Sequence, residues 1–167
     1  MKARVAALSS AAVLAVASPC VAYYEGMVPH TYADPVGIPT ICYGHTGLDV
    51  VPGRIATPAE CRALLNADLL EAIRALDQCV RVPVEVHEAA ALASFTYNVG
   101  GRALCTSTLV RMLNAGAPPQ QWCAQLSRWT KATVPVVRVK VELPGLVKRR
   151  ASERAMCLGD VEAWRPA

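Results

Sequence analysis

The stretch EGMVPHTYADPVGIPTICYGHTG, residues 25–47, decides the fold that we expect for this chain. Glycine or proline recurs in it every few residues, so that no helix of ordinary length fits. The short runs at 31–33 and 38–43 are typical of small strands, and Asp34-Pro35 between them has the composition of a turn. This part of the chain therefore predicts a small sheet.

Helical periodicity dominates the chain after this stretch. The segment Thr57-Pro58-Ala59-Glu60 has the pattern of a capping box with proline at the first helical position, and apolar residues then recur at helical spacing to about Cys79. Further helices are expected at 86–98, 107–112, 119–130 and 146–158, and strict alternation at 137–143 indicates a strand. The expected class is α+β, with a small N-terminal β-sheet lobe, a larger helical lobe and a cleft between them.

The N-terminus resembles an export signal. Lys2 and Arg4 precede an uncharged run, rich in alanine, valine and leucine, at residues 5–24. This is the pattern of a positive n-region followed by an apolar segment. Twenty helical residues span about 30 Å, which is just enough to cross a bilayer. Two alternatives remain: a signal peptide that is cleaved after Ala17 or Ala22, or an uncleaved apolar anchor helix.

Both alternatives divide the chain into a targeting segment, residues 1–22, and an exported domain, residues 23–167. Seven cysteines agree with an oxidising compartment, where disulfides persist. Hydrophobic residues make up 53% and charged residues 18% of the chain, which excludes a disordered protein. The net charge of +4 arises from basic residues late in the chain. These form either a solvated helix face or a surface that attracts polyanions.

Two carboxyl groups in contrasting surroundings mark a candidate catalytic site. Glu25 closes the apolar run, so we expect its carboxyl group to be partly removed from water, which favours the protonated form. Asp34 lies in a turn that should be wetter, which favours the ionised form. Glycoside cleavage requires an acid and a carboxylate of this kind. Thr40 adds a hydroxyl group that can orient a water molecule.

These residues also have the spacing of a known family. Glu25, Asp34 and Thr40, separated by eight and five residues, resemble the catalytic spacing of the phage-type lysozymes, glycoside hydrolase family 24. Further similar segments follow in order: TICYGHTG at 40–47, ECRALL at 60–65, FTYNVG at 95–100, TSTL at 106–109, SRW at 127–129, and GLVKRR at 145–150 with Glu153, Arg154 and Cys157. The resemblance covers about residues 23–158 and is strongest to lambdoid endolysins with a signal-arrest-release anchor.

The resemblance implies a lysozyme-like fold and hydrolysis of the β-1,4 bond between N-acetylmuramic acid and N-acetylglucosamine in peptidoglycan. Glu25 would be the general acid, Asp34 would position or activate water, and Thr40 would hold that water, with inversion as the outcome. We expect no metal, no cofactor and no nucleic-acid partner, and a monomer in the periplasm that the N-terminal segment first tethers to the inner membrane. His45 would be a structural hydrogen-bonding residue.

The resemblance also suggests how the cysteines are used. Cys42 either exchanges disulfides with Cys20 as a regulatory switch, or forms a static bridge to Cys61. The other expected bridges are Cys79–Cys105 and Cys123–Cys157, which leave Cys20 as the unpaired thiol.

Two other functions compete with the hydrolase. A lytic transglycosylase cleaves the same bond with one acid and without water, and a secreted domain could bind anionic wall polymers without catalysis. Asp34 and Thr40 at the family spacing favour water chemistry over the first alternative. The segment 134–143 is more strand-like than the glycine-rich loop expected in relatives, so the cleft rim there is not predicted.

Overall fold

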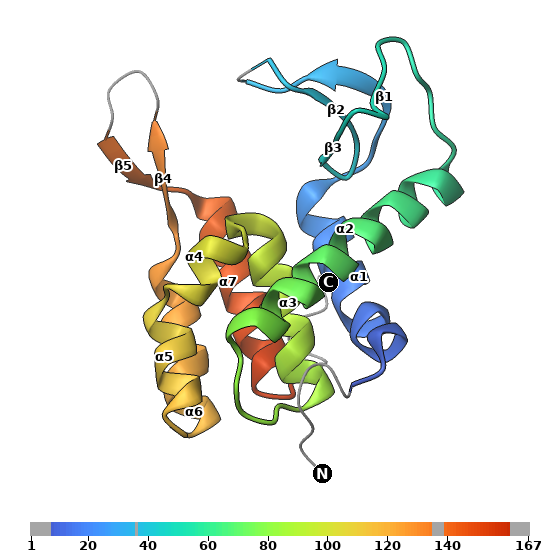
Figure 1. Ribbon diagram of the computed structural model, residues 1–167. Helices are drawn as coiled ribbons and strands as arrows, with labels where there is room; N and C mark the ends of the chain where they lie inside the picture. The colour runs from blue at the N-terminus through green and yellow to red at the C-terminus, as the bar shows by residue number, and fades with distance from the viewer. Residues whose placement is uncertain (1–7, 36, 135–138, 161–167) are drawn as a thin grey trace.

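The computed structural model describes residues 8–35, 37–134 and 139–160. A small sheet and a hairpin lie on either side of the upper part of the molecule, above a body of packed helices (Figure 1). The elements run in the order α1 (Ser10–Glu25), β1 (Val28–Ala33), β2 (Pro39–Cys42), β3 (His45–Thr46), α2 (Pro58–Cys79), α3 (Val86–Val99), α4 (Gly101–Cys105), α5 (Thr108–Asn114), α6 (Pro119–Cys123), the 3₁₀ helix η2 (Ala124–Arg128), β4 (Lys131–Val134), β5 (Val139–Glu142) and α7 (Pro144–Cys157). The expected α+β class is confirmed.

The β-lobe is a three-stranded antiparallel sheet in the order β1-β2-β3. Thr40 on β2 pairs with Tyr32 on β1 and with Thr46 on β3, so it lies on the central strand. The lobe has a small core of its own, formed by Ile41, Cys42, Val50, Ala56 and Cys61. The two expected strands are present, and β3, which has only two residues, is too short to recognise from sequence.

α2 begins at the predicted capping box. The Thr57 backbone N–H donates to Glu60 Oε2 at 2.6 Å, and the Glu60 backbone N–H donates to Thr57 Oγ1 at 3.2 Å. Each side chain thus satisfies a backbone donor that the first helical turn leaves without an intrahelical partner. The predicted start of this helix and its end at Cys79 are both confirmed.

α3 is the central helix of the helical lobe. Every residue from Glu88 to Thr96 is buried, and the helix contacts α1, α2 and α7. Alanine fills much of this run, and small side chains at a contact let helix axes approach more closely. The expected helix at 86–98 is confirmed, and it ends at Gly100, whose positive φ of 85° suits a residue without a Cβ.

α1 packs into the helical lobe along one stripe. Val13, Ala17, Cys20 and Val21 are buried in the same core as α3, and Ser18 donates a hydrogen bond to Asn66 Oδ1 on α2 at 2.8 Å. Most of the segment expected to be a signal or an anchor is therefore a core helix in this conformation. Among the described residues, no helix is both long and apolar enough to cross a membrane.

Three details of the C-terminal third differ from the expected elements. The helix expected at 119–130 is divided into α6 and η2. β4 was not expected, because four residues with mixed polarity give little strand signal without their partner β5. α7 begins at Pro144 rather than at residue 146, with proline in the first turn, where its missing N–H costs no hydrogen bond. Residues 137 and 138 of the expected strand lie outside the described residues.

All three expected disulfides are present: Cys42–Cys61, Cys79–Cys105 and Cys123–Cys157. Cys20 is free and buried. Burial, with a smaller contribution from Glu153, raises the pKa of the Cys20 thiol to about 11, and a thiol reacts only as its thiolate. The structure thus contains the static form of the Cys42 bridge, and exchange with Cys20 stays a prediction.

Candidate active site

Glu25 is the last residue of α1 and lies at the edge of the helical lobe. Gly26 ends the helix with a φ of 68°, and its N–H donates to the Ala22 carbonyl. The Glu25 side chain is 24% exposed, and its Oε1 accepts a hydrogen bond from Arg149 Nη1 on α7 at 2.5 Å. The carboxyl group is therefore partly removed from water, as the apolar run before it suggested, and a buried guanidinium group binds it.

Arg149 belongs to a buried charge cluster, defined here as Ser94, Arg149, Arg150 and Glu153. Glu153 Oε1 accepts hydrogen bonds from Ser94 Oγ at 2.8 Å and from Arg149 Nε at 3.1 Å. Its Oε2 lies 3.1 Å from Arg150 Nε. Burial alone lowers the pKa of Arg149, but Glu153 and Glu25 outweigh it and raise that pKa. The guanidinium group beside Glu25 thus stays charged.

α1 and α7 also meet through neighbours of the same residues. The Tyr24 hydroxyl lies 2.7 Å from Ser152 Oγ, and the Arg149 guanidinium carbon lies 5.9 Å from the centre of the Tyr24 ring. These contacts, together with the buried stripe of α1, fix the helix that ends at Glu25 against the helix that carries Arg149.

Asp34 and Thr40 lie in the β-lobe and share one backbone residue. Asp34 Oδ1 accepts a hydrogen bond from the Ile38 N–H at 2.8 Å, and the Thr40 hydroxyl donates to the Ile38 carbonyl at 3.0 Å. Asp34 is partly exposed in the turn between β1 and β2, whereas Thr40 is buried. The structure thus groups Asp34 with Thr40 around Ile38, and the two lobes contribute different members of the candidate site.

A pocket of about 410 Å³ reaches Gly44, which is a neighbour of Glu25. A Cβ atom on Gly44 would lie 3.8 Å from Glu25 Oε2, so the two residues are close neighbours. The pocket is lined by Gly44, Thr46, Asp68, Glu71, Ala72, Ala75, Thr96, Tyr97 and Gly101. The Tyr97 hydroxyl donates to the Tyr43 carbonyl at 2.7 Å, and burial raises its pKa, so it remains a neutral donor.

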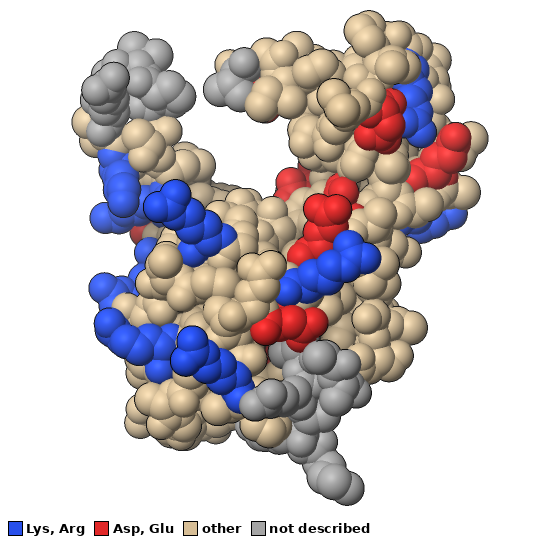
Figure 2. Space-filling view, in the orientation of Figure 1, with Lys and Arg blue, Asp and Glu red and all other residues tan. Residues whose placement is uncertain are grey.

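Figure 2 shows that the molecule is hollowed between the β-lobe and the β4–β5 hairpin. Acidic side chains gather on the β-lobe side of this hollow, and lysine and arginine gather on the side of the hairpin and the helices below it. The sequence suggested that the basic residues late in the chain could form a solvated helix face. Arg149 and Arg150 do not belong to such a face, because both are buried. The hollow thus has walls of opposite charge.

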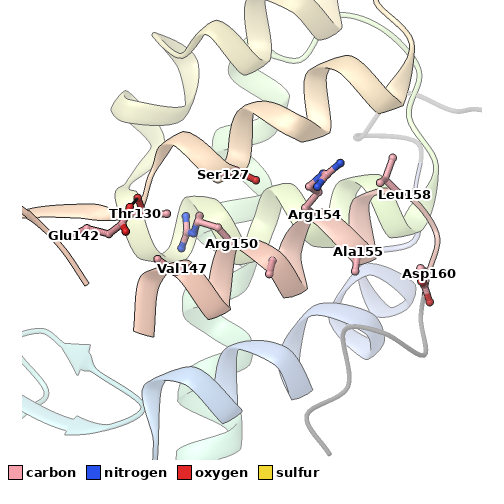
Figure 3. Close-up of a pocket in the computed structure, with 10 residues that line it drawn as sticks. Ser127, Thr130, Glu142, Val147, Arg150, Arg154, Ala155, Leu158 and Asp160 are labelled. Carbon is pink, nitrogen blue, oxygen red and sulfur yellow. Dashed lines mark hydrogen bonds between the residues drawn. The ribbon is translucent and has the colours of Figure 1, made fainter. Parts of the chain in front are cut away.

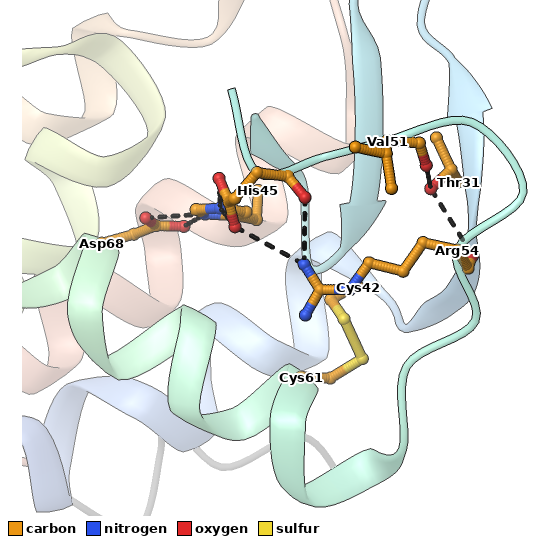
Figure 4. A network of polar contacts seen from close by, with 8 residues as sticks. Thr31, Cys42, His45, Val51, Arg54, Cys61 and Asp68 are labelled. Carbon is orange, nitrogen blue, oxygen red and sulfur yellow. Dashed lines mark hydrogen bonds and ion pairs between the residues drawn. A yellow bond between two sulfur atoms is a disulfide. The ribbon is translucent and has the colours of Figure 1, made fainter. Parts of the chain in front are cut away.

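His45 links the β-lobe to α2 (Figure 4). Its Nδ1 lies 2.9 Å from Asp68 Oδ2, and its Nε2 lies 3.2 Å from Asp49 Oδ2. Burial alone lowers the pKa of His45, but the hydrogen bonds to Asp68 and Asp49 outweigh it, so the pKa is raised. A protonated imidazole donates from both nitrogens, which suits this arrangement. The structural, hydrogen-bonding role expected for His45 agrees with these contacts.

The His45–Asp68 pair should therefore make stability depend on pH. Because the folded-state pKa of His45 is raised, its contribution is fully present below the unfolded-state value of about 6.5 and is lost as pH rises through the folded-state value. We expect Asp68→Asn to lower Tm most near pH 6 and least at alkaline pH. Thermal unfolding of both proteins from pH 5.5 to 9 measures this difference. The exposed partner gives the control: Asp49→Asn should have a smaller effect, and a Tm difference independent of pH would contradict the assignment.

A second groove, of about 560 Å³, lies along α7 (Figure 3). Arg150, Arg154 and Ala155 on α7 line it from one side, and Ser127 and Thr130 line it from the other. It shares no lining residue with the pocket beside Gly44. The groove is therefore separate from the pocket beside Gly44, although Arg150 of the buried charge cluster lines it.

Several members of the site were not predicted from sequence. Arg149 and Glu153 have the i, i+4 spacing of a helical ion pair, but the pattern does not show that both are buried or that Arg149 contacts Glu25. Trp122 is fully buried, and Trp129 packs edge-to-face on Phe95 with ring centres 5.2 Å apart, so both tryptophans belong to the core of the helical lobe.

Comparisons with known proteins give a consistent result. Residues 22–153 match the family model described as "Phage lysozyme". A protein named SAR-endolysin from Bacteriophage PS119 is 43% identical over 134 residues, which cover 80% of this chain and 76% of that protein. The muramidase domain of SpmX from Asticaccaulis excentricus has a TM-score of 0.78 at 30% identity, covering 90% of this chain and 96% of that one. The endolysin from Escherichia coli O157:H7 phage FAHEc1 has a TM-score of 0.79 at 28% identity, covering 100% of both chains.

Proposed function

The chain belongs to the phage lysozyme family, and from this premise we propose that it is a muramidase that hydrolyses the β-1,4 bond between N-acetylmuramic acid and N-acetylglucosamine in peptidoglycan. The lysozyme-like fold and the endolysin and muramidase relatives support a glycosidase. One observation carries the proposal: a half-buried carboxyl group, Glu25, is bound by a buried arginine at the border of a polar pocket.

Glu25 is the general acid of this proposal. Arg149 binds Oε1, whereas Oε2 lies toward Gly44 and the pocket, so Oε2 is the oxygen that would carry the proton to the leaving group. Gly44 has a φ of 87°, which favours glycine, and the absent side chain leaves room for a sugar next to Oε2. The acid thus has one fixed oxygen and one that faces substrate.

Asp34 and Thr40 are the residues that we assign to the water. Asp34 is acceptor-only when ionised, and the Ile38 N–H holds its Oδ1 in place. The Thr40 hydroxyl, which donates to Ile38, still has lone pairs that can accept from a water. A water held between the two carboxyl groups would attack from the face opposite the acid, which leads to inversion.

Product analysis tests this proposal against its main rival. We expect digestion of purified peptidoglycan to release fragments with reducing N-acetylmuramic acid, which mass spectrometry distinguishes from the 1,6-anhydro ends of a lytic transglycosylase. Proton NMR of the first product should show the α anomer if the reaction inverts. Anhydro ends would assign the chain to the transglycosylases, and an absence of cleavage would favour a wall-binding domain.

The site of action that we propose is the periplasm. A relative named SAR-endolysin and three disulfides support export. We propose a monomer whose residues 1–22 first tether it to the inner membrane, with peptidoglycan strands as its partner. Residues 23–167 then carry the proposed catalytic residues, and after release α1 adds the buried residues Val13, Ala17, Cys20 and Val21 to the core of the helical lobe. Full-length protein should move from the membrane fraction to the periplasmic fraction after depolarisation, and a shortened periplasmic product would show a cleaved signal instead.

A further inference from the structure

The buried charge cluster behind Glu25 is costly for a small domain. Arg149, Arg150 and Glu153 are 3%, 1% and 0% exposed, so three charged groups have lost nearly all their water. Charged groups that are removed from water stabilise a fold poorly, and well-packed apolar residues often replace them without loss of stability. An apolar pair of similar volume at positions 150 and 153 could therefore give the helical lobe as much stability as the buried ion pair does.

We propose that Glu153 and Ser94 are positioning residues for the general acid, and that they act on Glu25 through Arg149. This inference rests on the proposed function of Glu25. Neither residue lines the pocket beside Gly44. Glu153 contacts Ser94, Arg149 and Arg150, and Ser94 contacts Glu153 and Arg149.

The geometry of Arg149 carries the proposal. Its guanidinium group is held on three sides: Nε donates to Glu153 Oε1 at 3.1 Å, Nη2 donates to the Ser94 carbonyl at 3.3 Å, and Nη1 donates to Glu25 Oε1. A planar group fixed at two of its nitrogens has one orientation left for the third. Glu153 and Ser94 therefore determine where Arg149 places the oxygen of Glu25.

Ser94 has a second contact that orients Glu153 itself. Its hydroxyl donates to the same Oε1 that accepts from Arg149, at 2.8 Å, so Glu153 cannot turn that oxygen away without losing both bonds. The three residues come from two helices, Ser94 from α3 and the others from α7. They form a closed set of contacts behind Glu25.

Arg150 provides the control within the same cluster. Its Nε lies beside the other oxygen of Glu153, and its Nη2 donates to Asn98 Oδ1 at 2.8 Å. Among the described residues, Arg150 forms no hydrogen bond or ion pair with Glu25 or with Arg149. A variant without the Arg150 guanidinium group keeps the hydrogen bond between Arg149 and Glu153. A double variant without the charged groups of Arg150 and Glu153 loses one buried charge of each sign and also loses that hydrogen bond.

The experiment compares Arg150→Met with the double variant Arg150→Met, Glu153→Met in the full chain. Initial rates over a range of peptidoglycan concentrations give kcat and KM, and thermal unfolding gives the folded fraction. We expect the single variant to keep the kcat of the unchanged protein. The double variant should lose about 10- to 100-fold in kcat, because a small misplacement of a catalytic group costs this much. KM should stay within about twofold in both, because Glu153 does not contact substrate.

Ser94→Ala keeps the inference testable if the double variant does not fold. It removes one hydrogen bond from Glu153 and leaves the backbone carbonyl that Arg149 uses, so kcat should fall about two- to tenfold. An unchanged kcat in the folded double variant overturns the inference. If the double variant does not fold, an unchanged kcat in Ser94→Ala overturns it instead. A loss of activity that only follows the folded fraction, or that appears only in KM, also overturns it. Glu25→Gln is measured in parallel. If Glu25→Gln stays active, the proposed function has failed. If it is inactive while the double variant is fully active, only the positioning role has failed.

Discussion

Glu25→Gln should reduce the rate of peptidoglycan cleavage by about 10²- to 10⁴-fold, the range typical for loss of a general acid. Glutamine has the shape of glutamate and can still accept a hydrogen bond from Arg149 Nη1, but it has no proton to give to the leaving oxygen. Lysis of purified cell walls, followed by turbidity, measures the rate. We expect the fold to survive, because the side chain is only half-buried and keeps its main contact.

Asp77→Asn is the matched control for this substitution. Asp77 is an exposed carboxyl group on α2 that does not line the pocket beside Gly44, so its amide variant should keep the full rate. Circular dichroism and Tm of both variants separate a loss of chemistry from a loss of fold. Full activity in a folded Glu25→Gln protein would exclude Glu25 as the acid.

Removing the Cys123–Cys157 disulfide is the second change with a large expected effect. The bridge closes a loop of 34 residues, the longest of the three, and both cysteines are fully buried. The chain-entropy estimate for such a loop is about 3–4 kcal/mol of unfolding free energy. A typical domain has about 5–15 kcal/mol in total. Urea unfolding of Cys123→Ala with Cys157→Ala should therefore show a midpoint that falls by a large fraction of its original value.

Cys20→Ala controls for the loss of a buried sulfur without the loss of a cross-link. Cys20 lies in the same core and is as buried as the paired cysteines, but its thiol is free. Its replacement should cost about 1 kcal/mol, as expected for a small cavity in a core. Equal destabilisation by the two changes would show that packing, and not the cross-link, accounts for the effect.

Local signals explain which parts of the fold could be predicted. The start of α2 follows from residues within one helical turn, because Thr57 and Glu60 bond to each other's backbone. The glycines and prolines between residues 26 and 56 exclude long helices there whatever the rest of the chain does. β4 could not be recognised because a short strand is defined by its partner, and that partner lies on the far side of a turn.

The N-terminal helix shows why an apolar run is ambiguous. A bilayer and a protein core both favour apolar side chains, so the residues before Glu25 fit either. The buried stripe of Val13, Ala17 and Val21 has the spacing of one helix face, but every neighbouring position is also small or apolar, and the face cannot be read from the pattern.

The candidate site divides in the same way. Glu25, Asp34 and Thr40 were found from spacing and a family resemblance, whereas the cluster around Arg149 depends on helices that are distant in sequence. Glu153 and Ser94 are 59 residues apart and meet only because α3 and α7 pack together. Such contacts leave no local trace in a single sequence.

The part played by Ile38 has a practical consequence for how this site can be mapped. Its N–H and carbonyl bind Asp34 and Thr40, while its side chain is 47% exposed. Nineteen of the twenty amino acids supply the same two backbone groups, so an alanine scan would pass over this position, and natural variation there would look unconstrained. Only a change in the main chain itself, such as proline or an amide-to-ester replacement at position 38, would reveal it as the residue that joins Asp34 to Thr40.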